Sequence, residues 1–465
     1  MRLTTALRLI LLAATAHAKV ASEWLQTNHK EGDPPPSGKV DNDQLVILSG
    51  SDNVSRGSDA VNEPQPSSCP TIMIGTAEPD GDMDDGWKEL PTVAGFDLTR
   101  LVVDDDANAT LPYFLENTKD FSNIKRAVIT IPGKARNSWQ SANDMRNALV
   151  CAAGRESVNA DMDAVLIAAP QWLSDKDVDA GAGASSDVWF DNSSYQQGAA
   201  AIGPGDVSIS AYEAMDMLVN TFWNKDVYPA LETVVVASHS LGAQMTQRYA
   251  MLRTPQPQDS NLSFGIMNPG SYAWPVSDRP DTDDSCENSY NSWPYGLDDN
   301  DTDAFPSYVT DALRNRSAIR ERFFSKTIFY GYGLDDHGDG DTHCEAQWQG
   351  STHLGRGRNF VDMLGDLEGG FPGLQEVEYV EGVAHEEYLM FVSEAVQRRI
   401  FLFDETAGGT GNSTNSTGSD GDGDGDGDSD GSDDGDDNGS AHQYVHMPGV
   451  LFGSLLVSVV AGLYA

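Results

Sequence analysis

The segment that most constrains this chain is a run of β-branched residues that leads straight into a serine flanked by small residues. Residues 233–236, Thr-Val-Val-Val, are typical of a strand that is buried on both faces of a parallel sheet. Ala-Ser-His-Ser-Leu-Gly-Ala follows at 237–243, and a helix is predicted directly after it. So tight a turn requires small residues two places before and two places after its central serine, and it exposes the serine hydroxyl above the sheet. We therefore predict that Ser240 is a nucleophile, with an ordinary loop serine as the alternative.

The central part of the chain alternates buried strands with helices that have apolar residues at a spacing of 3.6. Strand-helix alternation predicts an α/β fold with a mostly parallel central sheet flanked by helices, here in one large domain at residues 66–404. Early antiparallel strands are expected somewhere within residues 65–125. The predicted strands are 127–131, 164–168, 233–236, 263–267, 327–330 and 377–380, and the predicted helices are 212–222, 244–251 and 387–399.

Two later loops carry the side chains that a serine nucleophile needs. In this arrangement the acid follows the serine in the chain and the histidine comes last. Asp336 follows strand 327–330, and His385 follows strand 377–380. Because the carboxyl ends of adjacent parallel strands meet at one edge of the sheet, His385 can reach both partners. The histidine would take the serine proton, and the aspartate would orient the imidazole. The alternative acids are Asp335, Asp339 and Asp341.

A serine nucleophile also needs backbone N–H groups that stabilise the oxyanion. One is expected from Leu241, the residue after the serine, and one from the loop that follows strand 127–131. In that loop Gly133 permits a close approach of the backbone, and Lys134 or Ala135 would supply the amide. A plain glycine turn is the alternative. Glycine is usual where Ser238 stands, and His-Gly is commoner than Pro-Gly at 132–133, so the motif departs from its usual form twice.

Both ends of the chain carry features of an exported protein. Residues 1–18 combine a positive start, an apolar stretch and small residues, which predicts a signal peptide. Residues 439–465 combine a polar spacer with an apolar tail, which predicts a removed signal for a glycosylphosphatidylinositol anchor. We expect attachment at Asn438, with Gly439 as the alternative, and a secreted protein held at the plasma membrane or in the cell wall. A tail-anchored membrane protein is the competing interpretation.

Two low-complexity segments flank the predicted domain. Residues 19–65 are rich in Pro, Gly, Ser, Asp and Asn, which predicts a flexible lead. Residues 405–438 consist almost entirely of Gly, Asp, Ser, Asn and Thr, which predicts a solvated acidic spacer rather than a metal-binding repeat.

Export brings expectations for cysteine and asparagine side chains. The four cysteines, Cys69, Cys151, Cys286 and Cys344, should form two disulfides, and three pairings are open. None of them has the close spacing of a zinc site. Eight N-x-Ser/Thr sequons besides that of Asn438 are expected to be glycosylated. They are Asn53, Asn108, Asn192, Asn261, Asn300, Asn315, Asn412 and Asn415.

The net charge of −43 narrows the range of partners. It argues against nucleic acids and against anionic membrane surfaces as binding targets, and it predicts weak capture of anionic substrates. We expect no cofactor and no metal. A small-molecule substrate and a lipid anchor are the expected partners, and the sequence leaves the oligomeric state open.

From residue 127 to residue 391 the chain resembles the α/β-hydrolase superfamily, and more narrowly a group of secreted fungal and bacterial serine hydrolases of the esterase or lipase kind. The serine turn and the Gly-Val-Ala-His segment at 382–385 carry the broad likeness. The narrower one rests on segments 169–172, 268–272, 293–297 and 341–350. The resemblance implies hydrolysis of an ester or related acyl bond without a defined substrate. It also implies that Cys286 pairs with Cys344, which leaves Cys69 for Cys151.

Residues 274–322 form an insertion between strands 263–267 and 327–330, the sixth and seventh once two early strands are counted. A cap-like segment that shapes a substrate pocket and a surface excursion are both consistent with its aromatic and aspartate residues.

Two functions follow for the whole chain. One is a cell-surface serine hydrolase, and a peptidase, a thioesterase or a deacetylating esterase would share its three residues. The other is a catalytically silent surface protein with an adhesion or binding role.

Overall fold

The computed structural model describes residues 47–49, 72–74, 79–93, 95–282, 286–287, 289–297, 305–310 and 314–402. The predicted signal peptide, the acidic spacer and the anchor signal lie outside these residues. Of the predicted lead, only Ile47–Ser49 is described; it forms strand β1 and pairs antiparallel with β2 (Ile72–Ile74), a pairing that the sequence did not predict. None of the described helices combines the length and the apolar character needed to cross a bilayer.

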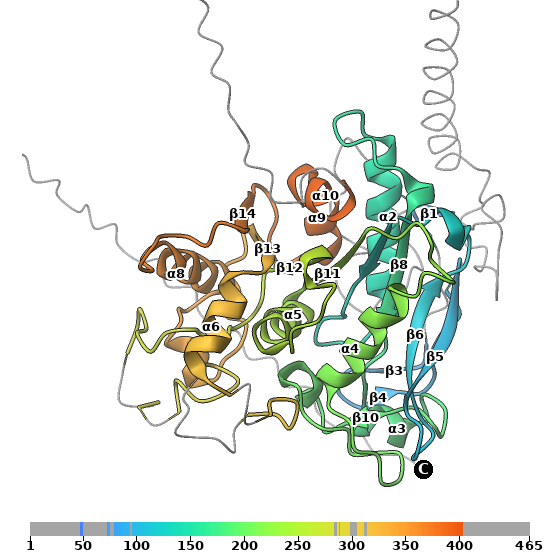
Figure 1. Cartoon of the computed structure of the whole chain (residues 1–465), viewed down its shortest axis with the longest axis horizontal. Coiled ribbons are helices and arrows are strands. Elements are labelled where there is room, and N and C mark those ends of the chain that lie inside the picture. Colours follow the sequence, from blue (N-terminus) through green and yellow to red (C-terminus); the bar gives the residue numbers. More distant parts are fainter. Residues whose placement is uncertain are drawn as a thin grey trace, which may run out of the picture. The chain divides into compact units, whose positions relative to one another are not determined.

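The fold is organised around one sheet of eight strands. In chain order these are β5 (Phe96–Asp104), β6 (Ala109–Glu116), β7 (Arg126–Ile129), β8 (Val165–Pro170), β11 (Thr233–His239), β12 (Leu262–Met267), β13 (Thr327–Gly333) and β14 (Gln375–Val380). Their order in space is β14-β13-β12-β11-β7-β8-β6-β5 (Figure 1). Strand β6 runs antiparallel to β5 and β8, and the other neighbouring pairs are parallel.

The helices of this domain are α2 (Ser138–Gly154), α3 (Asp175–Ala180), α4 (Ala211–Phe222), α5 (Ser240–Leu252), α6 (Arg316–Phe324), α7 (Cys344–Gln347), α8 (His353–Gly365), α9 (Glu387–Val392) and α10 (Glu394–Phe401). Single 3-10 turns occur at Phe121–Asn123, Met162–Ala164, Ser194–Gln197 and Asp259–Asn261. Two small sheets pair β3 (Gly81–Asp82) with β4 (Gly86–Trp87) and β9 (Leu173–Ser174) with β10 (Trp189–Phe190).

Successive residues of each central strand enter different hydrophobic clusters, as the period of two in a strand requires. In β11, Val234 and Val236 pack into a cluster with α4, α5, α6 and α8, whereas Val235 and Ala237 pack into a cluster with α2, α9 and α10. Figure 1 shows the two groups of helices on opposite sides of the sheet. The sheet is therefore covered on both faces, which explains why its central strands are almost continuously apolar.

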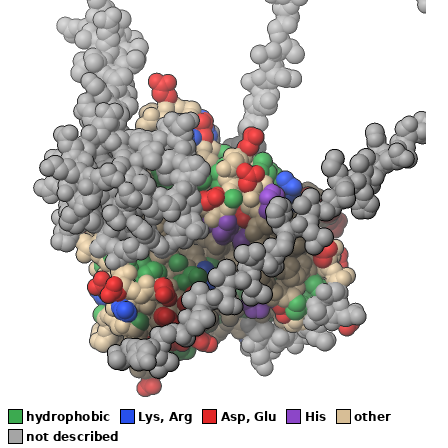
Figure 2. Space-filling view, turned by 180° about the vertical axis from the view of Figure 1, so that it is seen from behind, with side chains coloured by type: hydrophobic (Ala, Val, Ile, Leu, Met, Phe, Trp, Pro, Cys, Tyr) green, Lys and Arg blue, Asp and Glu red, His purple; other side chains and the backbone are tan. Residues whose placement is uncertain are grey.

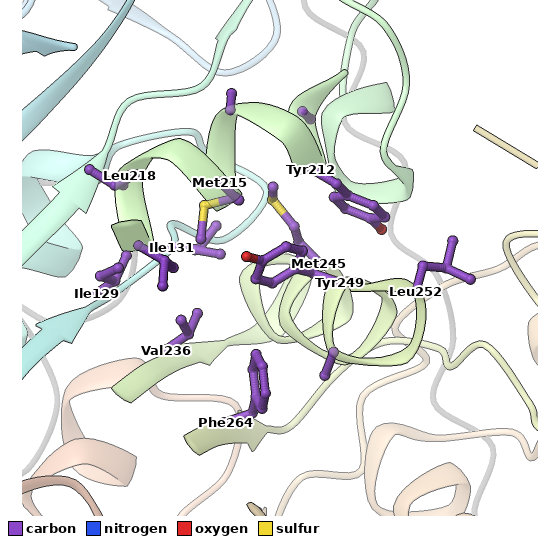
Figure 3. Packing of buried hydrophobic residues seen from close by; sticks show 14 of the residues in the cluster. Ile129, Ile131, Tyr212, Met215, Leu218, Val236, Met245, Tyr249, Leu252 and Phe264 are labelled. Atoms are coloured by element: carbon purple, nitrogen blue, oxygen red, sulfur yellow. The ribbon is translucent and has the colours of Figure 1, made fainter. Parts of the chain in front are cut away.

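Helices α4 and α5 cover the sheet next to the serine turn. Figure 3 shows Met215 of α4 and Met245 of α5 facing each other above Ile129 and Val236, with Phe264 of the neighbouring strand below α5. All five side chains are almost completely buried. This packing fixes α5, and hence the serine at its first residue, against the carboxyl ends of β7 and β11.

The predicted strands are confirmed, and the early antiparallel strands are β5 and β6. Two expectations were wrong in detail. Strand β14 is not buried on both faces: it lies at the edge of the sheet, with Glu376 and Tyr379 exposed. The helix predicted at 387–399 is split into α9 and α10, because Ser393 adopts an extended conformation with ψ 139°.

The insertion at 274–322 joins β12 to β13 and ends within α6. Its described part is tied to the segment that follows β13, since a disulfide links Cys286 to Cys344 and the Tyr295 hydroxyl donates to Asp341 at 3.0 Å. Trp293, Phe305 and Tyr308 are buried in the cluster on the α5 face. These aromatic side chains anchor the insertion to the domain.

Candidate active site

The serine turn has the strained geometry that the sequence predicts. Ser240 is the first residue of α5 and adopts a φ of 57°, a left-handed conformation that is uncommon outside glycine. Two residues later, a Cβ atom on Gly242 would lie 2.1 Å from the carbonyl oxygen of Ile131. Only glycine fits there, and its absent side chain lets the turn approach the end of β7.

Ser238, the departure from the usual glycine, has a structural role in this turn. Its side chain is fully buried, and its hydroxyl accepts hydrogen bonds from the backbone N–H of Ile131 and from the Thr246 hydroxyl, both at 3.0 Å. The side chain therefore ties the loop after β7 to the strand that carries the nucleophile and to helix α5.

Ser240, His385 and Asp336 lie in one chain of hydrogen bonds. Nε2 of His385 lies 2.9 Å from the Ser240 hydroxyl, and Nδ1 of His385 lies 2.7 Å from Oδ2 of Asp336. Ser240 and His385 are partly exposed, whereas Asp336 is 1 % exposed. With Nδ1 protonated, Nε2 is free to accept the serine proton. The acid is thus shielded while the serine and the imidazole remain accessible to a substrate.

The pKa of the Asp336 carboxyl is held well below its ordinary value. Burial alone would raise this pKa, but the close contact with His353 and the hydrogen bond with His385, together with the positive charge of these rings when protonated, outweigh it. The carboxylate therefore stays ionised next to His385.

The three alternative acids lie elsewhere. Asp335 and Asp339 are exposed. Asp341 accepts from Ser271, Tyr295 and His343 instead, and its bond to Tyr295 holds the insertion.

The acid loop and the histidine loop are bonded directly to each other. The N–H of Leu334 donates to Val380 at 2.9 Å, and that of Asp335 donates to Val383 at 3.0 Å. Asn268, at the carboxyl end of β12, reaches both loops. Its Oδ1 accepts from the N–H of Gly333 at 2.9 Å, and its Nδ2 donates to the carbonyl of Ala384 at 3.1 Å. One side chain thus sets the spacing between acid and histidine.

Two histidines that the sequence did not single out flank His385. The ring of His239 lies 4.5 Å from that of His385 between centroids, and the ring of His353 lies 4.0 Å away and is stacked. Burial, with the nearby His385 ring, lowers the pKa of His239 well below its ordinary value, so this imidazole is neutral. The position of His239 inside the serine turn could have indicated its role. His353 carries no such signal, because α8 and the acid loop meet only in three dimensions.

The predicted oxyanion loop is rigidly anchored beside Ser240. A Cβ on Gly133 would lie 3.6 Å from Cβ of Ser240, and the Arg136 N–H donates to the Gly133 carbonyl to close a turn around Lys134 and Ala135. Three further contacts hold the loop. The side-chain amide of Gln171 donates to the Arg136 carbonyl at 2.7 Å, and the Trp87 indole N–H donates to the Ala135 carbonyl at 2.7 Å. The Arg136 guanidinium donates two hydrogen bonds to the buried carboxylate of Asp177.

The other oxyanion donor belongs to helix α5. Leu241 is its second residue, so its N–H is among the donors that have no partner within the helix. Such a group, at the positive end of the helix dipole, is suited to bind a developing oxyanion.

Histidine side chains gather on one face of the molecule, among carboxylates that are more frequent than lysine or arginine (Figure 2).

Asp336, His353 and His385 have potential ligand atoms within 4.8 Å of one another, and they are the described residues near the serine that could hold a metal ion. The hydrogen bond between His385 and Asp336, the 3.2 Å contact between His353 and Asp336 and the stacking of the two rings already account for this arrangement.

The remaining predicted sites are described in part. Asn108, Asn192, Asn261 and Asn315 are exposed, as glycosylation sites must be. Cys286 and Cys344 form the pair that the resemblance implies, and Cys151 is also disulfide-bonded. Outside the described residues lie Cys69, Asn53, Asn300, Asn412, Asn415, Asn438 and Gly439.

No family model and no curated protein matches this chain. Solved structures that resemble it include LpqC, a poly(3-hydroxybutyrate) depolymerase from Bordetella parapertussis, with 19 % identity over 64 % of this chain and 88 % of that chain, at a TM-score of 0.43. Poly(aspartic acid) hydrolase-1 from Sphingomonas sp. KT-1 is 18 % identical, and the match covers 66 % of this chain and 98 % of that chain at a TM-score of 0.44. Siderophore hydrolase EstA from Aspergillus nidulans is 11 % identical, and the match covers 65 % of this chain and 93 % of that chain at a TM-score of 0.35.

Four features of the chain identify its fold. The mostly parallel sheet has helices on both faces, and its fifth strand, β11, turns sharply at a serine into a helix. An acid loop follows the seventh strand, and a histidine loop follows the eighth. This chain has the α/β-hydrolase fold.

Proposed function

We propose that this protein is a serine hydrolase that cleaves an ester or related acyl bond through an acyl-enzyme intermediate. Ser240 is the nucleophile, His385 the general base and acid, and Asp336 the residue that orients the imidazole. The single observation that carries the proposal is the chain of hydrogen bonds at 2.9 Å and 2.7 Å from Ser240 through His385 to Asp336. It joins three loops that are remote in sequence, at the edge of the sheet where the serine is exposed.

In the acylation step, Oγ of Ser240 attacks the carbonyl carbon of the substrate while its proton moves to Nε2 of His385. The ionised Asp336 stabilises the imidazolium that forms, which is consistent with the low pKa of this carboxyl. The tetrahedral intermediate collapses when His385 returns the proton to the leaving alcohol, and the acyl group remains on Ser240. Water then attacks the acyl-enzyme by the same route, with His385 again as the base.

The oxyanion would be bound by two backbone N–H groups. Leu241 supplies one from the first turn of α5, and Lys134 or Ala135 supplies the other from the anchored loop beside Ser240. Fixed donors of this kind need no reorganisation when charge develops, and losing one typically costs about a hundred- to a thousandfold in rate.

The charge of the protein supports neutral esters as the substrate class. At a net charge of −43 the protein repels anions, so neutral esters are favoured over carboxylated or phosphorylated ones.

We place the enzyme at the cell surface, because the features of residues 1–18 and 439–465 fit export and a lipid anchor. Release from intact cells by a phosphatidylinositol-specific phospholipase would test that location.

A panel of p-nitrophenyl esters of increasing acyl length, run on the purified chain over a broad pH range, tests the activity. We expect hydrolysis of neutral esters, and a loss of at least about a thousandfold in Ser240→Ala. Ser260→Ala is the matched control, because Ser260 is exposed and outside the site. Protein that cleaves no ester and takes up no fluorophosphonate would instead support a catalytically silent binding protein.

A further inference from the structure

His353 contacts the acid of the triad but belongs to a different part of the chain. It is the first residue of helix α8 and is 8 % exposed. Its Nδ1 is hydrogen-bonded to the carbonyl oxygen of Gly338 at 3.1 Å and also lies 3.2 Å from Oδ1 of Asp336, a buried oxygen that has no hydrogen-bond partner within the described part of the chain. His385 bonds the other carboxylate oxygen, Oδ2, at 2.7 Å. The two oxygens of Asp336 therefore each face a separate imidazole.

The backbone of α8 holds His353 in this position independently of its ring. The N–H of His353 donates to the Gly338 carbonyl at 3.0 Å, and that of Leu354 donates to the Asp336 carbonyl at 3.1 Å. Arg356 adds hydrogen bonds to the Asp339 and Asp341 carbonyls at 2.7 Å and 2.8 Å. The start of α8 is thus fixed to the acid loop, and the imidazole of His353 has little freedom to leave the carboxylate.

The ring of His353 also packs on the catalytic candidate. Its centroid lies 4.0 Å from that of His385 with 27° between the planes, and His239 lies against the same ring at 4.5 Å. His385 is therefore flanked by two imidazoles, which restrict its rotation while its Nε2 remains directed at Ser240.

We propose that His353 is a positioning residue of the triad: its Nδ1–H, held between the Gly338 carbonyl and Oδ1 of Asp336, restrains the carboxylate so that Oδ2 stays aligned with Nδ1 of His385. The inference rests on the proposed hydrolase function. A carboxylate with one oxygen unrestrained can rotate about its Cβ–Cγ bond, and the His385 ring then loses its fixed orientation. The donor matters more than the stacked ring, because an aromatic contact restrains tilt but does not orient the carboxylate.

Two substitutions separate these contributions. His353→Asn keeps an N–H donor at a place close to that of Nδ1 and removes the stacked ring. His353→Phe keeps the ring and removes the donor. His337→Asn is the matched control, because His337 is in the same loop but exposed.

The readout is the rate of labelling by a fluorophosphonate probe, resolved into the maximal rate and the half-saturating probe concentration. We expect His353→Phe to lower the maximal rate about ten- to a hundredfold with the half-saturating concentration unchanged. His353→Asn should stay within a few-fold of wild type, and thermal melting should show both variants folded. Equal rates in wild type and His353→Phe, or equal losses in both variants, would overturn the inference.

A second measurement does not depend on activity. Proton NMR of the full chain with ¹⁵N-labelled histidine should show two hydrogen-bonded Nδ1–H resonances near the carboxylate. One of them should disappear in His353→Phe while the other persists; a spectrum unchanged by this substitution contradicts the proposed bond. If wild-type protein does not react with the probe, or Ser240→Ala reacts equally well, the hydrolase function fails instead, and the NMR result still decides the role of His353.

Discussion

The hydroxyl of Ser238 accepts a hydrogen bond from the backbone N–H of Ile131 at 3.0 Å. This bond joins the strand that leads into the serine turn to the start of the loop that would bind the oxyanion. The same hydroxyl accepts from Thr246 on α5, also at 3.0 Å. A serine in place of the usual glycine therefore adds a buried connection and does not disturb the turn.

Ser238→Ala should destabilise the protein by about 1–3 kcal/mol, because the N–H of Ile131 would remain buried without its acceptor. Chemical denaturation of the full chain measures this difference. Ser263→Ala, compared in unglycosylated protein because Ser263 completes the Asn261 sequon, is a suitable control: Ser263 is also buried, on the neighbouring strand β12, and its side chain forms no hydrogen bond with the described part of the chain. Equal stabilities of the two variants would show that the Ser238 bond contributes nothing.

Gly242→Ala should abolish labelling of Ser240 or prevent folding. A Cβ atom at this position would lie 2.1 Å from the Ile131 carbonyl oxygen and 2.9 Å from that of Pro132, and backbone atoms cannot give way as a flexible side chain could. Gly365→Ala provides the comparison, because a Cβ there meets no atom within 4 Å and Gly365 is the last residue of α8. The control should keep full labelling, with a stability equal to or slightly above that of wild type. A Gly242→Ala protein that folds and labels normally would contradict the described turn.

Asn268→Asp should slow labelling of Ser240 by about tenfold or more. The substitution keeps an acceptor for the Gly333 N–H but replaces the donor to the Ala384 carbonyl with a repelling oxygen, which loosens the histidine loop. Asn159→Asp is a matched control, since Asn159 is exposed and has a similar positive φ of 52° against 44° for Asn268. Labelling that is equally fast in both variants would remove Asn268 from the set of positioning residues.

The parts of the site that the sequence predicts are those fixed by local pattern. Apolar runs identified the six later strands, and the small residues around Ser240 identified the turn. Chain order then placed Asp336 and His385 in their loops. The contacts of His353 and Asn268 depend on how α8 and β12 meet these loops, and no spacing in the sequence encodes that. The break at Ser393 and the exposed face of β14 likewise follow from tertiary packing, which overrides local propensity.

Burial raises the pKa of Glu387, the first residue of α9, to about 7. The folded protein thus retains a proton that the unfolded chain releases from about pH 4.3 upward. The stabilising effect of this proton is complete below the unfolded pKa and is lost as the pH rises through about 7. Glu387→Gln removes the titration, so the variant should gain stability relative to wild type between pH 5 and pH 8, by up to about 3 kcal/mol.

Denaturant unfolding at the two pH values tests this, with Glu381→Gln as the control because Glu381 is exposed in the preceding loop. If the difference in free energy of unfolding between Glu387→Gln and wild type is the same at pH 5 and pH 8, the Glu387 carboxyl does not titrate between these pH values.

The proposed reaction requires Ser240 to attack acyl carbons with the help of His385 and Asp336. The most direct measurement is peptide mass spectrometry of the full chain after reaction with a fluorophosphonate. We expect one phosphonyl adduct, located on Ser240, which is absent in Ser240→Ala and strongly reduced in His385→Ala. An adduct on another residue, or labelling that survives Ser240→Ala, would contradict the account.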